Sequence, residues 1–255
     1  MASGMLNPMF QALPATVRDR IKEWTKSLEA ALGDDLVAIM LTGGVARGDY
    51  RIGESDVNAL IVLRDASFEK LDAISSAMQA ARYGARVEPT ILTEDELPGV
   101  CDAFPLLYDE IARSNLILVG KDPFASAVVV HDTHRRLRVE QELREAQIWL
   151  RRVVTDALGA REAIGGAVGR KIRQVRRPLR ALLNLKGIAC KEDIANVLAS
   201  AGNVYGVDVA PLSTPRERPG EAHAALTNLL AAAIKDVTSM ETGPSSLRKR
   251  GVVVK

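Results

Sequence analysis

Two glycines and a group of polar side chains lie between two apolar runs early in the chain. The first run, Leu36 to Leu41, enters a turn at Gly43-Gly44, and the second run, Ala59 to Leu63, follows three polar residues: Ser55, Asp56 and Asn58. Backbone amides that follow a Gly-Gly turn at the start of a helix form a site for an anion. A carboxylate at the entrance of a neighbouring strand can hold a divalent cation. The stretch therefore predicts a site for a phosphate group and Mg²⁺.

The elements that position these residues follow from hydrophobic periodicity. The two apolar runs predict strands that are buried on both faces. A third strand should lie at the sheet edge, because Pro89 cannot donate to a central ladder. The predicted elements of this half are a helix over Thr16–Leu32 ended by Gly33, strands over Leu36–Leu41 and Asn58–Leu63, a helix from Ser67 to about Ala81, a strand over Arg86–Leu92, a capping box at Thr93–Glu96, a helix over Pro105–Arg113 and a strand over Asn115–Val119.

From Ala125 onward the pattern becomes helical. The predicted helices are Thr133–Leu158, Arg161–Lys186 with an interruption at Pro178, Lys191–Ala201 with a stop at Gly202, and Glu221–Met240. The segment between the last two carries three prolines and is expected to be a mobile loop, and the tail from Gly243 is expected to fray. The chain therefore predicts a domain of sheet and helices over residues 1–125 and an all-helical bundle domain over residues 126–255.

Composition narrows the class of protein. Of 255 residues, 47% are hydrophobic and 26% are charged, as in soluble globular proteins. We expect no membrane segment, because no apolar stretch approaches about 20 residues, and residues 1–14 lack the pattern of a signal peptide. Cys101 and Cys190 are far apart and have no metal-ligand spacing, which predicts a reduced, cytoplasmic protein with two free thiols.

Charge is unevenly distributed along the chain. Residues 1–130 have a net charge of −7, and the remainder has +9. The basic half includes a group of cationic residues that either close over a polyanion or pair with the acidic half and solvent: Arg170, Lys171, Arg173, Arg176, Arg177 and Arg180. Interleaved aromatic residues are absent, which argues against a nucleic-acid partner.

The motif Thr42-Gly-Gly-Val-Ala-Arg-Gly48, followed by Ser55-Asp-Val-Asn58 and an apolar strand, resembles the polymerase-beta-type nucleotidyltransferase superfamily. The order of the predicted elements matches that superfamily, and the helical half resembles the bundle in the two-domain arrangement of kanamycin nucleotidyltransferase and its relatives. Three segments resemble a bacterial subgroup of nucleotidyltransferase-like proteins with no settled substrate: Phe104–Ile111, Leu118–Pro123 and Arg136–Arg144. The fold class implied is α/β (α+β), a nucleotidyltransferase-like mixed sheet followed by an all-α helical bundle.

The resemblance implies Mg²⁺-dependent transfer of a nucleoside monophosphate from an NTP to an acceptor, with metal ions held by carboxylates on adjacent strands. It implies that Asp56 is a metal-binding and catalytic carboxylate. The nucleotide-binding residues implied are the turn glycines and three nearby polar residues: Gly43, Gly44, Arg47, Arg51 and Ser55. A third carboxylate, which would act as general base, belongs on the third strand, where Glu88 is the candidate; Glu88 can also be an ordinary exposed strand residue.

The sequence departs from the superfamily pattern at Asn58, where a second metal-binding carboxylate is expected. An amide oxygen is a weaker, neutral ligand, so metal affinity should fall. Gly44 also replaces the usual serine.

Three hypotheses remain open. The first is an active Mg²⁺-dependent nucleotidyltransferase with Asp56 and Glu88 as metal or base ligands and Asn58 as a weak metal ligand. The others are a degenerate relative that binds a nucleotide or a partner protein without turnover, and a structural scaffold with an empty cleft. The acceptor remains open among aminoglycosides, proteins and nucleotides, and a homodimer is one option for the assembly.

Overall fold

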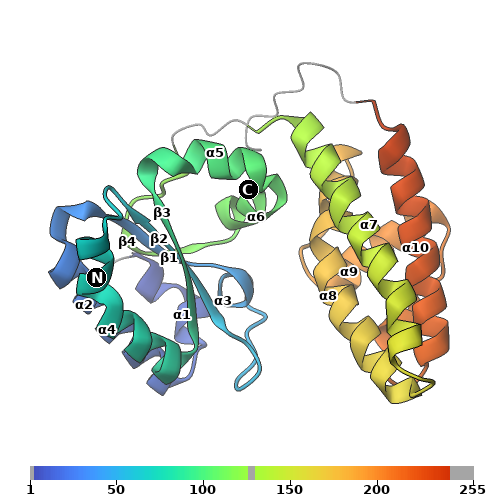
Figure 1. Cartoon of the computed structure of the whole chain (residues 1–255), viewed down its shortest axis with the longest axis horizontal. Coiled ribbons are helices and arrows are strands. Elements are labelled where there is room, and N and C mark those ends of the chain that lie inside the picture. The colour runs from blue at the N-terminus through green and yellow to red at the C-terminus, as the bar shows by residue number, and fades with distance from the viewer. Residues whose placement is uncertain (1–2, 126–129, 242–255) are drawn as a thin grey trace. The chain divides into compact units, whose positions relative to one another are not determined.

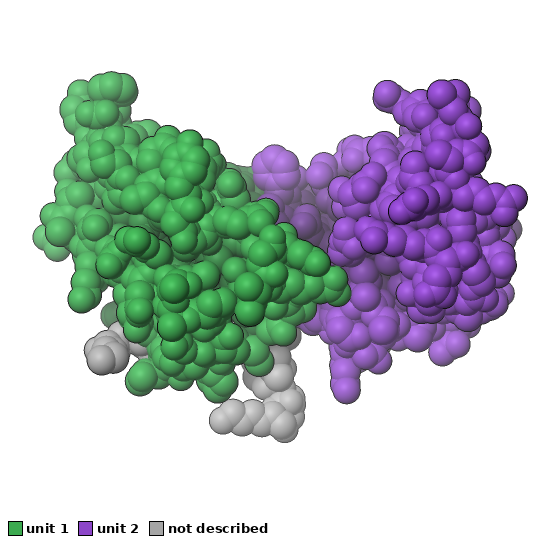
Figure 2. All heavy atoms as spheres, turned by 90° about the horizontal axis from the view of Figure 1, so that it is seen from below, with its two compact units in different colours: residues 1–101, 108–128 green, residues 102–107, 129–255 purple. Residues whose placement is uncertain are grey.

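The computed structural model describes residues 3–125 and 130–241. These residues form two compact units (Figure 2), the first with residues 3–101 and 108–125 and the second with residues 102–107 and 130–241. Residues 102–107 thus group with the helical half. The boundary between 125 and 126 stays a prediction.

The first unit is built on a four-stranded mixed sheet (Figure 1). Its strands are β1 (Leu36–Leu41), β2 (Val57–Leu63), β3 (Val87–Thr93) and β4 (Leu116–Gly120), in the order β3-β2-β1-β4. β1 runs antiparallel to both β2 and β4, whereas β2 and β3 are parallel. The predicted mixed sheet is therefore confirmed, and the proline-containing strand β3 lies at the edge.

Two long helices, α2 (Ala15–Leu32) and α4 (Phe68–Ala85), pack side by side on one face of this sheet (Figure 1). Apolar residues of both helices join those of β1 and β2 in one buried cluster, which includes Ile21, Leu28, Ile39, Ile61 and Ile74. Burial of these aliphatic side chains supplies the main driving force for folding of the unit. The remaining elements are η1 (Ser3–Leu6), α1 (Pro8–Gln11), η2 (Gly33–Asp35), α3 (Gly43–Arg47), η3 (Glu94–Glu96), α5 (Leu97–Ala103) and α6 (Pro105–Arg113).

Between residues 130 and 241, the second unit contains four helices: α7 (Asp132–Asp156), α8 (Arg161–Leu185), α9 (Ile194–Tyr205) and α10 (Pro219–Ser239), with a short turn η4 (Ala210–Ser213) before the last. Their apolar faces meet in one core whose centre includes Leu143, Leu179 and Leu229, all fully buried. The predicted helical bundle is confirmed.

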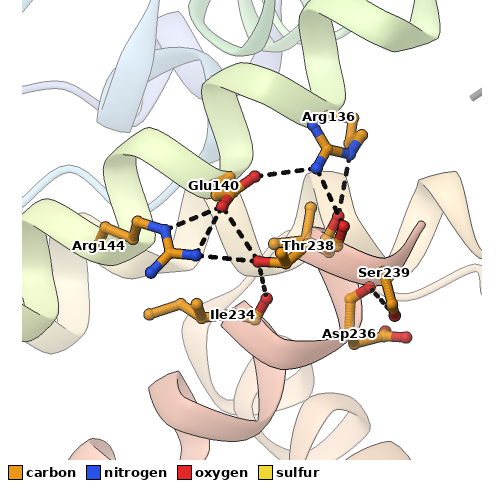
Figure 3. A network of polar contacts seen from close by, with 8 residues as sticks. Arg136, Glu140, Arg144, Ile234, Asp236, Thr238 and Ser239 are labelled. Atoms are coloured by element: carbon orange, nitrogen blue, oxygen red, sulfur yellow. Dashed lines mark hydrogen bonds and ion pairs between the residues drawn. The ribbon is translucent and has the colours of Figure 1, made fainter. Parts of the chain in front are cut away.

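Helices α7 and α10 are also joined by a polar network (Figure 3). Glu140 on α7 accepts hydrogen bonds from Arg136 at 3.0 Å and Arg144 at 2.8 Å, and from the Thr238 hydroxyl on α10 at 3.0 Å. Arg136 Nε donates to the carbonyl of Val237 at 3.0 Å. These bonds satisfy the polar groups where the end of α10 lies against α7.

Three predictions about the helical half are wrong. Helix α8 continues through Pro178. Burial of the neighbouring Val175 and Leu179 side chains in the core stabilises the helix enough to offset the hydrogen bond that proline cannot donate. Helix α9 continues through Gly202 to Tyr205. Gly202 is needed where the chain folds back, because a Cβ there would meet the Val207 carbonyl oxygen at 2.9 Å.

The proline-containing segment after α9, expected to be a mobile loop, is instead folded onto the core of the second unit. Pro211 and Leu212 in η4 are buried, and Pro219 is the first residue of α10. No helix within residues 3–125 and 130–241 is long and apolar enough to cross a membrane.

Candidate functional site

The predicted glycine turn connects the end of β1 to the short helix α3. Gly43 has a φ of +64°, a conformation that favours glycine. A Cβ at this position would also lie 2.8 Å from Nδ2 of Asn58, and the Thr42 N–H donates to the Asn58 carbonyl at 2.9 Å. The turn and the start of β2 are therefore interlocked, with the Asn58 side chain placed directly against Gly43.

The second glycine of the turn lies against Asp49. A Cβ at Gly44 would meet Oδ1 of Asp49 at 3.0 Å, and the Asp49 N–H donates to the Gly44 carbonyl at 2.9 Å. Glycine at position 44, where the superfamily pattern has serine, therefore leaves room for the Asp49 carboxylate close to the main chain of the turn.

Arg47, at the end of α3, is directed toward α6. Its Nη1 lies 2.5 Å from Oε1 of Glu110, whose side chain is only 9% exposed, and its Nη2 lies 3.3 Å from Asp49. Because Arg47 itself is 18% exposed, this ion pair is largely shielded from solvent. The structure thus uses Arg47 to fix α3 to α6, and a phosphate-binding role for Arg47 would require it to leave Glu110.

The three predicted metal-site positions are brought together at one end of β2 and β3. Asn58 is in register with Glu88 on the parallel neighbour, so their side chains leave the same face of the sheet about 4.8 Å apart. Asp56 precedes Asn58 by two residues, and the adjoining Val57 N–H donates to the Arg86 carbonyl at 2.9 Å, which extends the strand pairing to that point. The predicted convergence of positions 56, 58 and 88 therefore has a geometric basis.

Both carboxylates of this group are paired with arginines. Oδ1 of Asp56 accepts a hydrogen bond from Arg86 Nε at 2.9 Å and forms an ion pair with Arg86 Nη2 at 2.8 Å, while Arg86 Nη1 donates to the Gly53 carbonyl at 2.8 Å. Oε2 of Glu88 accepts from Arg82 Nη2 at 2.9 Å. The carboxylates are about half exposed, at 46% for Asp56 and 47% for Glu88.

Arg86 adopts an unusual backbone conformation, with φ 52° and ψ 40° in the left-handed region at the end of α4. Glycine or asparagine is the usual residue at such a helix end. The backbone N–H of Arg86 bonds to the Ala81 and Arg82 carbonyls. These bonds anchor the main chain of Arg86, while its guanidinium reaches across to the loop before β2.

The loop between α3 and β2 carries the last two predicted residues. The Ser55 hydroxyl accepts a hydrogen bond from the Arg51 N–H at 3.0 Å, so Ser55 shapes the loop. The Arg51 side chain is 72% exposed and lies 3.7 Å from Glu54. Ser55 thus has a defined structural partner, whereas Arg51 extends into solvent.

The residues present do not fit a Mg²⁺ site of the expected kind. Mg²⁺ needs near-octahedral oxygen ligands, but Asn58 supplies a neutral amide, and one oxygen of each carboxylate, Oδ1 of Asp56 and Oε2 of Glu88, already accepts an arginine N–H group. Within residues 3–125 and 130–241, no group of three or more His, Cys, Asp or Glu side chains is arranged to hold a metal ion.

Sequence reasoning missed Arg82 and Arg86. Neither lies in a motif, and their contacts with Glu88 and Asp56 depend on where α4 ends. The sequence indicates these contacts only indirectly. The pattern predicts that α4 ends near Ala81, whereas the helix extends to Ala85 and so includes Arg82 in its last turn.

The cationic residues of α8 divide into partnered and exposed groups. Arg176 donates to the Glu192 carbonyl at 3.1 Å, and Arg180 lies 2.9 Å from Oε1 of Glu192. Lys171 lies over the Trp149 ring at 4.2 Å, and partial burial lowers the pKa of its ammonium group. These three residues therefore have structural roles within the second unit, whereas Arg170 and Arg173 are exposed.

Among solved structures, that of spectinomycin adenyltransferase AAD(9) from Enterococcus faecialis, with ATP and spectinomycin, is similar to this chain. The match covers 87% of this chain and 99% of that chain, with a TM-score of 0.52 and 13% sequence identity. The fold is nucleotidyltransferase-like. No protein-family model and no curated protein sequence matches the chain. At this identity the likeness shows the fold alone, and the chemistry of the site rests on the residues of this chain.

Proposed function

We propose that the protein binds a nucleoside triphosphate at the glycine-turn end of the first unit's sheet and does not transfer its nucleotidyl group. The observation that carries this proposal is the state of the three convergent positions: an amide at 58, and arginine-paired carboxylates at 56 and 88. A nucleotidyltransferase-like fold with a glycine turn supports nucleotide binding, and the similar structure of AAD(9) was solved with ATP.

In this proposal the turn at Gly43 and Gly44 offers backbone amides to the phosphates. Arg51 is exposed and can approach them from the neighbouring loop, whose shape Ser55 maintains. Arg47 contributes indirectly, since its bond to Glu110 fixes the helix that follows the turn.

The competing hypothesis is Mg²⁺-dependent transfer of a nucleoside monophosphate to a small-molecule or protein acceptor. Its support is that Asp56 and Glu88 are half exposed and lie near position 58 at the same edge of the sheet. It requires a metal ion to bind beside the guanidinium groups that already pair with both carboxylates.

The first test is thermal unfolding of the full chain with ATP, GTP, CTP or UTP, each with Mg²⁺ and with EDTA. A ligand at about one hundred times its Kd stabilises the folded state by about 2.7 kcal/mol. We expect at least one NTP to raise the melting temperature. No shift with any NTP in either condition would contradict nucleotide binding.

The second test separates binding from transfer. We expect no pyrophosphate release from the bound NTP with Mg²⁺ and a panel of aminoglycosides, nucleotides and proteins. Release by the unaltered protein would support the transferase hypothesis instead. Asn58→Asp adds a carboxylate beside Glu88 and should raise Mn²⁺ affinity, as measured by calorimetry.

A further inference from the structure

Two arginine side chains, those of Arg86 and Arg82, carry positive charge at the candidate site. We propose that the guanidinium groups of Arg86 and Arg82 serve as the positive charges for the triphosphate, so that the nucleotide binds without a metal ion. This inference rests on the proposed nucleotide binding and specifies how the same site recognises its ligand.

The charges of the site balance without a metal. Asp56 and Glu88 contribute two negative charges, and the arginines bonded to them contribute two positive charges. A single divalent cation between two carboxylates would give the same sum. Because each carboxylate is already paired with a guanidinium group, a metal ion would have to bind beside a positive charge, whereas a phosphate group is attracted by that charge.

Both arginines retain N–H groups for a ligand. A guanidinium has five N–H donors. Arg86 uses one N–H each of Nε, Nη1 and Nη2 for Asp56 and the Gly53 carbonyl, which leaves two of its five N–H groups for a ligand in the described part of the chain. Arg82 uses Nη2 for Glu88, and the side chains are 50% exposed for Arg86 and 52% for Arg82. Charged N–H donors of this geometry suit phosphate oxygens.

The guanidinium of Arg86 is held in place at both ends of the residue. Its main chain is tied to α4 through the Ala81 and Arg82 carbonyls and to β2 through Val57, and its head group is tied to Asp56 and Gly53. The left-handed backbone at this position would suit glycine better. A non-glycine residue with a strained backbone beside convergent carboxylates is the kind of outlier that marks a functional position.

Calorimetric titration of the full chain with ATP, in EDTA and in Mg²⁺, tests the inference. We expect binding in EDTA to be at least as tight as in Mg²⁺, because the metal neutralises part of the charge that the arginines recognise. Arg86→Gly should weaken binding in EDTA by about tenfold or more, as loss of a charged hydrogen-bond donor does.

Arg86→Gly is a suitable variant because glycine adopts the same backbone conformation, so its melting temperature should not fall by more than a few degrees. The matched control is Arg20→Ala, which removes the same charge from an exposed pair with Glu23 on α2 and should leave ATP affinity unchanged.

The outcomes are distinct. Binding that requires Mg²⁺, or binding that Arg86→Gly leaves unchanged while the variant stays folded, overturns the role of the arginines and leaves nucleotide binding intact. No ATP binding by the parent protein in either condition, when another NTP also fails, contradicts the proposed function itself.

Discussion

The two units each contain a cluster of arginines and carboxylates. The clusters differ in how deeply the carboxylates are buried and in how many hydrogen-bond partners each carboxylate has. In the second unit Glu140 is 15% exposed and bonds to Arg136, Arg144 and Thr238 across two helices (Figure 3). In the first unit Asp56 and Glu88 are about half exposed, and each bonds to one arginine side chain. A shielded, saturated cluster holds elements together, whereas an exposed, unsaturated cluster keeps donors free for a ligand.

The largest stability effect should come from breaking the shielded cluster. Glu140→Ala leaves two arginines and a hydroxyl without their acceptor, and we expect the free energy of unfolding to fall by about 2 kcal/mol. Glu88→Ala breaks a half-exposed pair and should lower it by less than about 1 kcal/mol. Chemical denaturation of both variants measures the difference; equal losses would remove the distinction between the clusters.

A smaller loss should follow from Gly43→Ala in the turn. A left-handed backbone costs a residue with a Cβ about 1 kcal/mol, and the new methyl group also displaces the Asn58 amide. Gly206→Ala is the control, since Gly206 has the same φ of 64° with nothing within 4 Å of its Cβ position. Gly206→Ala should lose only the stability that the strained backbone costs, Gly43→Ala should lose somewhat more, and only Gly43→Ala should weaken nucleotide binding. A nucleotide affinity that both variants retain would argue against a ligand at the turn.

Leu158 and Arg86 are both non-glycine residues with positive φ. Replacing each by glycine therefore separates the stability that the Asp56–Arg86 ion pair contributes from the cost of the strained backbone. Leu158 has a φ of 46° and is 94% exposed, so Leu158→Gly should raise the free energy of unfolding by up to about 1 kcal/mol. Arg86→Gly relieves the same strain but loses the ion pair, so its gain should be smaller by the contribution of that pair, about 0–1 kcal/mol. A loss of several kcal/mol for Arg86→Gly would show that the pair is structural.

The smallest effect is confined to acidic pH. The hydrogen bond from Arg144, with further help from Thr238 and the charge of Arg136, holds the pKa of Glu140 below its ordinary value of 4.5 despite the opposing effect of burial. A carboxyl group whose pKa is depressed in the folded state contributes stability above its unfolded pKa and loses it as pH falls through the folded value. The difference in melting temperature between the parent and Glu140→Gln should therefore be constant near neutral pH. It should shrink as the pH falls below the ordinary pKa of a glutamate side chain. A difference that is independent of pH down to strong acid would mean that Glu140 has an ordinary pKa.

Much of the fold could be predicted from the sequence because burial periodicity acts locally. The continuous apolar runs of β1 and β2, the proline of β3 and the stripe of α2 each carried their own signal. The errors arose where tertiary packing overrode a local signal: Pro178 and Gly202 both lie inside helices because the core of the second unit covers them.

The candidate site was predictable only in part. The turn and positions 56, 58 and 88 could be found from residue types and spacing, since adjacent strands bring them together. The arginines could not, because the hydrogen bond between Arg86 and Asp56 joins residues 30 positions apart through a helix end whose conformation is untypical of arginine. The same limit applies to Arg47 and Glu110, which are 63 positions apart.

The most direct test of the central claim is a crystal structure of the full chain grown with ATP and Mn²⁺, with anomalous data collected for manganese. We expect the phosphates of ATP to lie against the Gly43-Gly44 turn and the guanidinium of Arg86, with Asp56 still bonded to Arg86 and no manganese peak at Asp56. A manganese ion coordinated by Asp56 and Asn58, with Arg86 displaced, would contradict metal-independent binding.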